Sequence, residues 1–302
     1  MENDLELSGI TGSTPIGFMA ALGILRICTM NNRTGTVRIS WKQNDDWVAV
    51  LNTDASLSED DLISSIFSFM QSEKQSFFHV DDVRIKPDIF KGYATELLDS
   101  ATYSDRSKVD YWTAFGTEMI VDKSQGLIKP TSFYMSTGKQ KFLGKVKKNM
   151  ERITKAKIRE ALFGPWRYND SHELAMGWDP STHRIHALRM KDPSSDKSNL
   201  CESAAEWLAY ESLPMFPTIV GKDGKVVTSG FSDAYFTWPI WDVPVELDTV
   251  LTMILSREIF DESLRNRLAS RGVAAIYRSR RLEFAKGYGV FLPGELVWLP
   301  SS

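Results

Sequence analysis

The stretch TPIGFMAALGILRICTM, residues 14–30, decides the fold class of this chain. Thr14 is a favourable N-cap, and Pro15 suits the first helical position because its missing N–H would have no helical partner there. The residues that follow are apolar on nearly every side, which is typical of a helix inside a protein. Gly17 and Gly23 leave room for a neighbouring backbone to approach the helix closely. The sequence therefore predicts a buried N-terminal helix.

A hairpin is predicted after this helix. Val37, Ile39 and Trp41 alternate with polar residues, a polar turn follows at 43–46, and residues 47–51 run back. Further helices are expected from Ser58 and over Asp110–Met119, Lys139–Glu160, Ala204–Leu213, Leu247–Leu255 and Glu262–Ser270. Strands are expected around the turn at 221–224 and over Val273–Phe284 and Gly289–Trp298. This order is not a regular βαβ succession, so it predicts an α+β fold of mixed helices and mostly antiparallel short strands.

The length of 302 residues corresponds to one large domain or two modest ones. Proline, aspartate and serine are frequent between Gly164 and Ser198, and the Asp-Pro pairs there favour turns over helices. We therefore expect an N-terminal α+β region over residues 1–164, which includes a basic helix at 139–160, and a C-terminal α+β region over residues 165–302. A single domain is the alternative.

Composition excludes several classes of protein. Hydrophobic residues make up 42% and charged residues 25%, which is ordinary for a globular chain and excludes a disordered one. The longest apolar run, residues 16–25, is too short to cross a bilayer, and the acidic N-terminus lacks the basic start of a signal peptide. Cys28 and Cys201 cannot form a disulfide framework, and two thiols fit a reducing cytosol. We expect a cytoplasmic protein that does not contact a membrane.

Positive charge is concentrated between Lys139 and Glu160. This segment holds nine cations and two anions, although the whole chain has a net charge of −3. A salt-bridged helix face usually alternates in sign, and this one does not. We interpret it as a binding surface for a phosphate backbone or an acidic partner, with a solvated helix face as the alternative. The candidate nucleic-acid contacts here are Lys139, Lys141, Lys145, Lys147, Lys148, Arg152 and Lys155.

A second basic cluster lies in the strand expected over Val273–Phe284. Alternation along that strand places Arg278 and Arg280 on one face and Arg281 on the other. Arginine forks suit phosphate oxygens, and the aromatic residues interleaved with them can stack on bases. We predict that these three arginines contact nucleic acid. The alternative is a charged edge strand that discourages aggregation.

Nine tryptophans is a high number for a chain of this length. In the segment WPIW, residues 238–241, a rigid proline lies between two indole rings. We predict Trp238 and Trp241 as anchors at a partner interface, where tryptophan is favoured. Core filling is the alternative interpretation of both rings.

Short motifs for catalysis and metal binding are absent from the sequence. The chain has no Gly-x-Ser-x-Gly elbow, no phosphate-binding P-loop and no Gly-x-Gly-x-x-Gly loop. His183 and His186 have a metal-like spacing only on a helix, which the neighbouring Asp-Pro turns disfavour. The loop at residues 9–14 fits the cap of a buried helix better than an anion site. We therefore predict no catalytic residues, no metal site and no cofactor.

Seven segments spread over most of the chain share a pattern with one known family. They are LSG at 7–9, PIGFMAALGILR at 15–26, FYMSTGKQKFL at 133–143, LFGPW at 162–166, GWDP at 177–180, LAYESLPMFP at 208–217 and FTWPIW at 236–241. Together they resemble CRISPR-associated proteins of the type I-G group, formerly called I-U. The most specific part is the opening, where a loop leads into a proline-led apolar helix, as at the start of the large-subunit proteins of that group.

The resemblance implies a non-enzymatic subunit of a Cascade-like RNA-guided surveillance complex. Such a subunit would hold a guide RNA together with other Cascade subunits, contact target DNA near its adjacent motif, and help to recruit a helicase–nuclease transiently. In RNA-guided systems base pairing reads the sequence, while protein reads the backbone and the short adjacent motif. Two alternatives remain open: a protein-only scaffold or regulator of a defence system, or an enzyme whose site matches no short motif.

Overall fold

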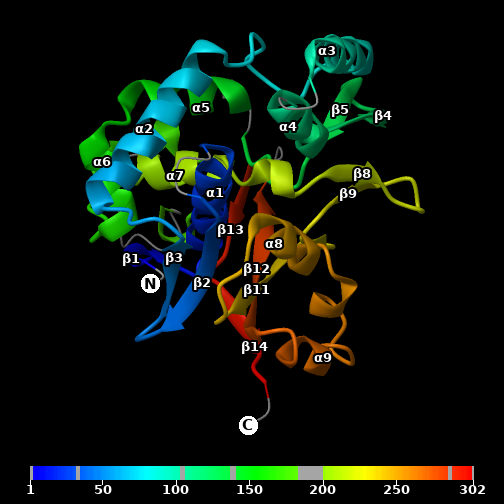
Figure 1. Ribbon diagram of the computed structural model, residues 1–302. Helices are drawn as coiled ribbons and strands as arrows, with labels where there is room; N and C mark the ends of the chain where they lie inside the picture. The colour runs from blue at the N-terminus through cyan, green and yellow to red at the C-terminus, as the bar shows by residue number, and fades with distance from the viewer. Residues whose placement is uncertain are drawn as a thin grey trace, which may run out of the picture.

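The computed structural model describes residues 3–31, 35–102, 106–136, 141–182, 200–284 and 288–300. Helix α1 (Pro15–Asn31) lies near the centre of the molecule, with other elements around it (Figure 1). It is buried from Pro15 to Cys28, which confirms the predicted buried helix. Its start is capped as expected, because the Gly17 N–H donates a hydrogen bond to Thr14 Oγ1 at 3.1 Å.

A three-stranded antiparallel sheet packs against α1. Its strands follow the order β1 (Asn3–Thr11), β3 (Trp47–Thr53) and β2 (Val37–Gln43). Strands β2 and β3 are the predicted hairpin, in which Gln43 pairs with Trp47. Strand β1 is an addition to the predicted elements, and it pairs with β3 along most of its length.

Four helices pack together beside α1, on the left of Figure 1. Helix α7 (Ser203–Tyr210) approaches α1 so closely that a Cβ on Gly23 would lie 1.9 Å from the carbonyl oxygen of Leu208. Helix α2 begins after Ser58, as predicted, and the Asp61 N–H donates to the Ser58 hydroxyl at 3.2 Å. The four helices are α2 (Glu59–Gln75), α5 (Phe142–Arg152), α6 (Lys155–Phe163) and α7 (Ser203–Tyr210).

The larger sheet is also antiparallel and comes from the last part of the chain. Strand β12 (Val273–Phe284) has the predicted bounds and pairs with β11, β13 and β14. The other strands are β10 (Phe231–Ser232), β11 (Tyr235–Trp241), β13 (Tyr288–Phe291) and β14 (Glu295–Trp298). Helix α8 (Leu247–Ile254) agrees with the prediction, whereas α9 is limited to Asn266–Ala269.

Two further helices and two hairpins form the upper right of Figure 1. The helix predicted over Asp110–Met119 is wrong at its C-terminal end, because the chain leaves the helix at Gly116 and continues as a strand. The short strands expected around the turn at 221–224 are present as β8 and β9. The elements of this region are α3 (Pro87–Ser100), α4 (Ser107–Phe115), β4 (Gly116–Asp122), β5 (Leu127–Pro130), β8 (Thr218–Val220) and β9 (Val226–Thr228).

One cluster of buried apolar side chains includes residues from both sides of residue 164, so a domain boundary at that point does not separate two cores. Trp238 stacks on Phe18 with 5.9 Å between ring centroids, and Trp241 meets Trp41 edge-on at 6.2 Å. Trp238 Nε1 donates to the Gly12 carbonyl at 2.8 Å. Trp238 and Trp241 are 0% exposed, so the predicted partner interface at these two residues is wrong. Both rings fill the core.

The antiparallel pairing of these sheets, together with the helices, confirms the predicted α+β fold. A small pair of strands, β6 (Asp170–Ser171) and β7 (Leu200–Cys201), joins two connecting segments. None of the described helices combines the length and the apolar character needed to cross a membrane.

Candidate nucleic-acid interface

The basic segment at 139–160 forms two helices, α5 and α6, where the sequence predicted one. Ile153 ends α5 in an extended conformation, with φ −71° and ψ 130°. Thr154 then caps α6, and its Oγ1 accepts a hydrogen bond from the Lys157 N–H at 3.4 Å. The single predicted helix is wrong because this cap interrupts the helical hydrogen bonds between Arg152 and Lys155. Lys139, one of the predicted contacts, lies outside the described residues.

Lys145 belongs to the interior. Its side chain is buried, and Nζ donates a hydrogen bond to the Ala175 carbonyl at 2.8 Å. Burial lowers the pKa of Lys145 to about 8, and the nearby Glu206 carboxyl opposes that shift. The predicted nucleic-acid contact at Lys145 is therefore wrong, because its amino group points into the protein.

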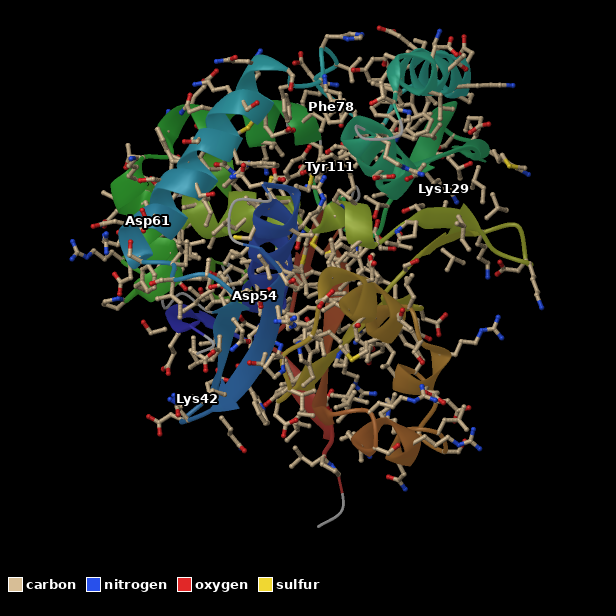
Figure 2. The ribbon with its side chains drawn as sticks, in the orientation of Figure 1. Lys42, Asp54, Asp61, Phe78, Tyr111 and Lys129 are labelled. Carbon is tan, nitrogen blue, oxygen red and sulfur yellow. The ribbon has the colours of Figure 1, made fainter. Side chains whose placement is uncertain are left out.

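Several other cations of this segment, including the predicted contacts Lys141 and Lys155, have partners within the chain. Arg159 of α6 forms an ion pair with Glu59 at 2.7 Å and another with Asp60, both at the start of α2. Figure 2 marks this end of α2 by Asp61. The remaining pairs are Lys141 with Asp82 at 3.7 Å, Lys155 with the Ser64 hydroxyl at 2.9 Å, and Lys157 with Asp170.

Lys147, Lys148 and Arg152 form a patch that we call the α5 patch. All three are exposed, and none of them forms an ion pair with another described residue. Lys148 and Arg152 are one turn apart on the same face of α5, so their charges lie close together. Glu151 is the one carboxylate of this helix. The patch therefore keeps most of its positive charge available to a ligand.

A hollow of about 930 Å³, which we call the basic hollow, is lined by residues that follow α5 in the chain, beginning with Thr154, and by residues of α2. Four cations line it: Lys155, Lys157, Arg159 and Arg167. Its carboxyl groups are Asp60, Glu160 and Glu202.

Glu202 is a neutral member of the basic hollow at pH 7. Its side chain is 3% exposed, and Oε1 has no hydrogen-bond partner among the described residues. Burial and the neighbouring carboxylates of Glu160 and Asp170 raise the pKa of Glu202 to about 8. Because Lys157 pairs with Asp170 and Arg159 with Glu59 and Asp60, the cations of the hollow without an ion-pair partner among the described residues are Lys155 and Arg167.

A second hollow of about 770 Å³ adjoins the first, and the two share Gly164 and Pro165 in their walls. We call it the aromatic hollow, because Trp166 and Tyr168 line it together with several prolines. The Pro-, Asp- and Ser-rich pattern of residues 164–198 predicts only an irregular connection and does not indicate this hollow. The signal was the order Pro-Trp-Arg-Tyr at 165–168, in which a cation lies between two aromatic residues directly after a basic helix.

The arginines of β12 are distributed as alternation predicted. Arg278 donates to Glu295 at 3.0 Å, its guanidinium lies 4.9 Å from the centre of the Tyr235 ring, and the hydrogen bond to Glu295 raises its pKa. Arg280 is exposed and has no ion-pair partner among the described residues. Arg281 points to a different part of the molecule and contacts the Tyr134 carbonyl at 3.3 Å. One arginine of the three is therefore available to a ligand without breaking an existing contact.

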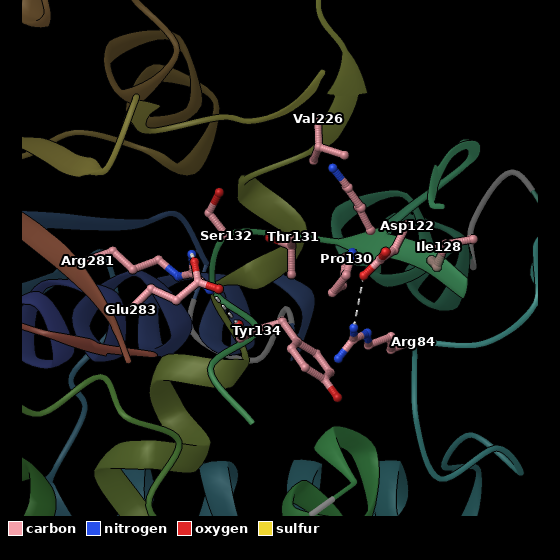
Figure 3. A pocket seen from close by; sticks show the side chains of 11 residues that line it. Arg84, Asp122, Ile128, Pro130, Thr131, Ser132, Tyr134, Val226, Arg281 and Glu283 are labelled. Atoms are coloured by element: carbon pink, nitrogen blue, oxygen red, sulfur yellow. Dashed lines mark hydrogen bonds and ion pairs between the residues drawn. The ribbon is translucent and has the colours of Figure 1, made fainter. Parts of the chain in front are cut away.

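Figure 3 shows the pocket that Arg281 lines, with Tyr134 at its centre and Arg84 on the other side. The pocket measures about 310 Å³. Each arginine has its own carboxylate: Arg84 pairs with Asp122 at 3.3 Å and Arg281 with Glu283 at 3.1 Å. Because Arg281 is held by both Glu283 and the Tyr134 carbonyl, these contacts favour a structural role for Arg281.

Buried carboxyl groups near the basic hollow should make the protein less stable as the pH rises from about 5 to 8. The pKa values of Glu202 and Glu206 are raised from 4.5 to about 8 in the folded protein, chiefly by burial. In this range the folded state binds more protons than the unfolded state, so each pH unit costs on the order of 1 kcal/mol per group. Lys145, whose pKa is lowered from 10.5 to about 8, changes the pH dependence of stability only above this range.

Urea denaturation at about pH 5.5, 7 and 8 measures this dependence. The double variant Glu202→Gln, Glu206→Gln should show a flatter profile, because glutamine does not titrate. A wild-type free energy of unfolding that increases between pH 5.5 and 8 would contradict the assignment.

Comparisons with known proteins identify no relative. A scan against protein-family models, a search of curated proteins and a search of solved structures each found no match to this chain. His183 and His186 lie outside the described residues, and within those residues no group of three His, Cys, Asp or Glu side chains is arranged to hold a metal ion. The geometry described above is therefore the basis for a functional proposal.

Proposed function

We propose that this chain contacts nucleic acid as a non-catalytic subunit of a CRISPR type I Cascade-like RNA-guided surveillance complex in antiviral defence. In this proposal the α5 patch and the basic hollow hold the phosphate backbone of guide RNA or target DNA. Base pairing between the two strands reads the sequence. The role requires a cytoplasmic location, contacts with other Cascade subunits and transient recruitment of a helicase–nuclease.

The observation that carries the nucleic-acid part is the excess of positive charge in the α5 patch. Lys147, Lys148 and Arg152 are exposed in a chain whose net charge is −3. A solvated helix face usually has carboxylates among its cations. Arg159 of α6, by comparison, has a carboxylate partner in Glu59 at the start of α2. The α5 patch has one carboxylate, Glu151, for three cations and forms no ion pair among the described residues, so a polyanion would supply the missing partners.

The subunit part rests on the seven segments that resemble type I-G proteins. Three of these segments form most of α1, the end of α7 with the turn after it, and most of β11, and their side chains are largely buried. Because the matching residues lie in the core, the resemblance supports a common fold more strongly than it supports a common binding surface. The absence of a recognisable catalytic motif agrees with a binding subunit.

Replacing Lys147, Lys148 and Arg152 together by glutamine should weaken binding to oligonucleotides of any sequence. Each phosphate contact that is lost should flatten the log–log salt dependence of binding by about 0.7 on single strands and about 0.9 on duplex DNA. Three lost contacts therefore change the slope by about 2 on single strands. Fluorescence anisotropy with a labelled oligonucleotide at about 50 to 200 mM salt measures the slope.

The matched control removes the same number of charges elsewhere. Lys91, Lys123 and Lys222 are exposed and lie outside both the α5 patch and the basic hollow. Their triple replacement by glutamine should leave the slope close to that of the wild type. If the two triple variants lose affinity equally, the effect is one of net charge and the α5 patch is not the site.

The subunit proposal has its own experiment. The tagged chain should co-purify from its native cells with a defined small RNA and with several partner proteins. Purification of the chain without RNA, or with proteins alone, would contradict the subunit proposal and favour a protein-only scaffold.

A further inference from the structure

The aromatic hollow has the walls expected of a site for a flat apolar ring. Its apolar lining comes from Phe163, Pro165, Trp166, Tyr168, Pro180 and Pro293. Its volume of about 770 Å³ falls in the usual range for small-molecule sites. The rings of Trp166 and Tyr168 have their centroids 6.0 Å apart and are inclined at 62°, so one of them presents a face where the other presents an edge.

Hydrogen bonds hold both rings in place. Trp166 Nε1 donates to the Ala161 carbonyl at 3.0 Å, and the Tyr168 hydroxyl lies 3.3 Å from Ser181 Oγ, which can accept from it because the Ser181 hydrogen goes to Asp179 at 2.7 Å. Tyr168 has a φ of 54°, in the left-handed region that bulky residues rarely adopt. Such a conformation persists only where surrounding structure enforces it, and it concentrates at binding sites. The two rings are therefore preorganised.

The wall between the two hollows is equally well fixed. Gly164 and Pro165 form this wall, and the Ser8 hydroxyl of β1 donates to the Phe163 carbonyl at 2.8 Å just before it. A Cβ on Gly9 would lie 2.5 Å from the Ala161 carbonyl oxygen, so β1 and the end of α6 are in direct backbone contact. A rigid partition of two residues thus separates an aromatic site from a positively charged one.

This juxtaposition matches the chemistry of a nucleotide in a single strand. A base offers a flat ring that stacks on an aromatic side chain, and the phosphate beside it carries a negative charge. On the basic side of the partition, Lys155 and Arg167 line the hollow, and neither forms an ion pair among the described residues. A base in duplex DNA is already stacked and cannot reach such a hollow, so the geometry favours a single strand.

We propose that the aromatic hollow binds one unstacked base of a single-stranded nucleic acid, with Trp166 as the stacking platform, while the adjacent phosphates lie on Lys155 and Arg167. This inference rests on the proposed function, because it assumes that the chain binds nucleic acid. It adds the class of ligand, a single strand with an extruded base. Trp166, Tyr168 and Arg167 then act together as one nucleotide site.

The test compares oligothymidylate with an abasic oligonucleotide of the same length and backbone, and includes oligouridylate to distinguish RNA from DNA. The wild type should bind the thymidylate roughly tenfold more tightly than the abasic strand. Trp166→Ala should abolish that preference without changing the salt dependence, and Trp166→Phe should retain most of it. The glutamine triple of the α5 patch should weaken the binding of both strands alike.

The outcomes separate this inference from the function on which it rests. Equal wild-type affinity for the two strands, or an unchanged preference in Trp166→Ala, would overturn the base site and leave the phosphate contacts standing. Absence of binding to every strand would overturn both proposals.

A measurement on the wild type covers the case in which Trp166→Ala does not fold. An oligonucleotide carrying 5-iodouracil should cross-link to the peptide that contains Trp166 and Tyr168 after irradiation. Cross-links confined to other peptides would overturn the base site.

Discussion

Alanine in place of Gly23 should destabilise the protein by about 3 kcal/mol or more, the upper end of the cost of overpacking a core. The new Cβ would lie 1.9 Å from the carbonyl oxygen of Leu208 and 2.9 Å from its carbonyl carbon. Both are backbone atoms of α7, so no side chain can rotate away to relieve the overlap. The helices α1 and α7 would have to separate, and the buried surface between them would open.

Chemical denaturation followed by circular dichroism measures this loss. The control is Gly92→Ala in α3, where a Cβ would meet no atom within 4 Å. That exposed helical position should gain about 0.5 to 1 kcal/mol, because alanine has the higher helix propensity. An unchanged midpoint for Gly23→Ala would mean that α1 and α7 are not in backbone contact.

Removing either partner of the buried ion pair between Arg26 and Glu211 should cost about 3 to 5 kcal/mol. Arg26 Nη1 lies 3.0 Å from Glu211 Oε2, and Nη2 donates to the Ser107 hydroxyl at 2.8 Å. The Tyr111 hydroxyl donates to the same carboxylate, and Figure 2 labels this tyrosine in the interior. The side chains of Arg26 and Glu211 are at most 5% exposed, so water cannot replace a lost partner.

The two single variants should not be equally costly. Burial raises the pKa of Glu211 to about 7, so this carboxyl can take up a proton when its partner is lost. Arginine cannot lose its charge in a protein, so Glu211→Leu should be more destabilising than Arg26→Met. The double variant should recover part of the loss, because no charge then remains buried. Urea denaturation of the three variants at neutral pH would contradict this if the losses of the single variants simply added.

Local patterns in the sequence predicted those elements whose signal is confined to neighbouring residues. The alternation from Val37 to Trp41 marked β2, and the cap at Ser58 marked the start of α2. Strand β1 carries the same kind of signal, since Leu5 and Leu7 alternate with polar residues. It was obscured by the acidic character of the segment.

Whether a given charged side chain is buried or exposed could not be predicted from the sequence. Lys145 and Lys148 are the same residue type on one helix, but different parts of the structure face their side chains. Lys145 meets the Ala175 carbonyl, which comes 30 residues later in the chain, whereas Lys148 meets solvent. Spacing along one helix cannot show which residue the rest of the fold covers.

The basic hollow shows the same limit on a larger scale. Its lining comes from α2, from α6 and the segment after it, and from Glu202. No short motif spans such distances, so the sequence indicated the charge of α5 and α6 but not the cavity beside them. The burial of Trp238 has the same cause, because its partner, the Gly12 carbonyl, is 226 residues away.

The separation of 226 residues between Gly12 and Trp238 also means that the two parts of this contact are synthesised at different times. Ribosomes add about 5 to 20 residues per second, so β11 follows α1 by on the order of 10 to 40 s. Until then Phe18, which stacks on Trp238 in the finished protein, has no native cover on that side. During this interval the apolar surface of α1 is accessible to chaperones and to other nascent chains. A translational pause before Tyr235 would lengthen the time for which this surface is exposed.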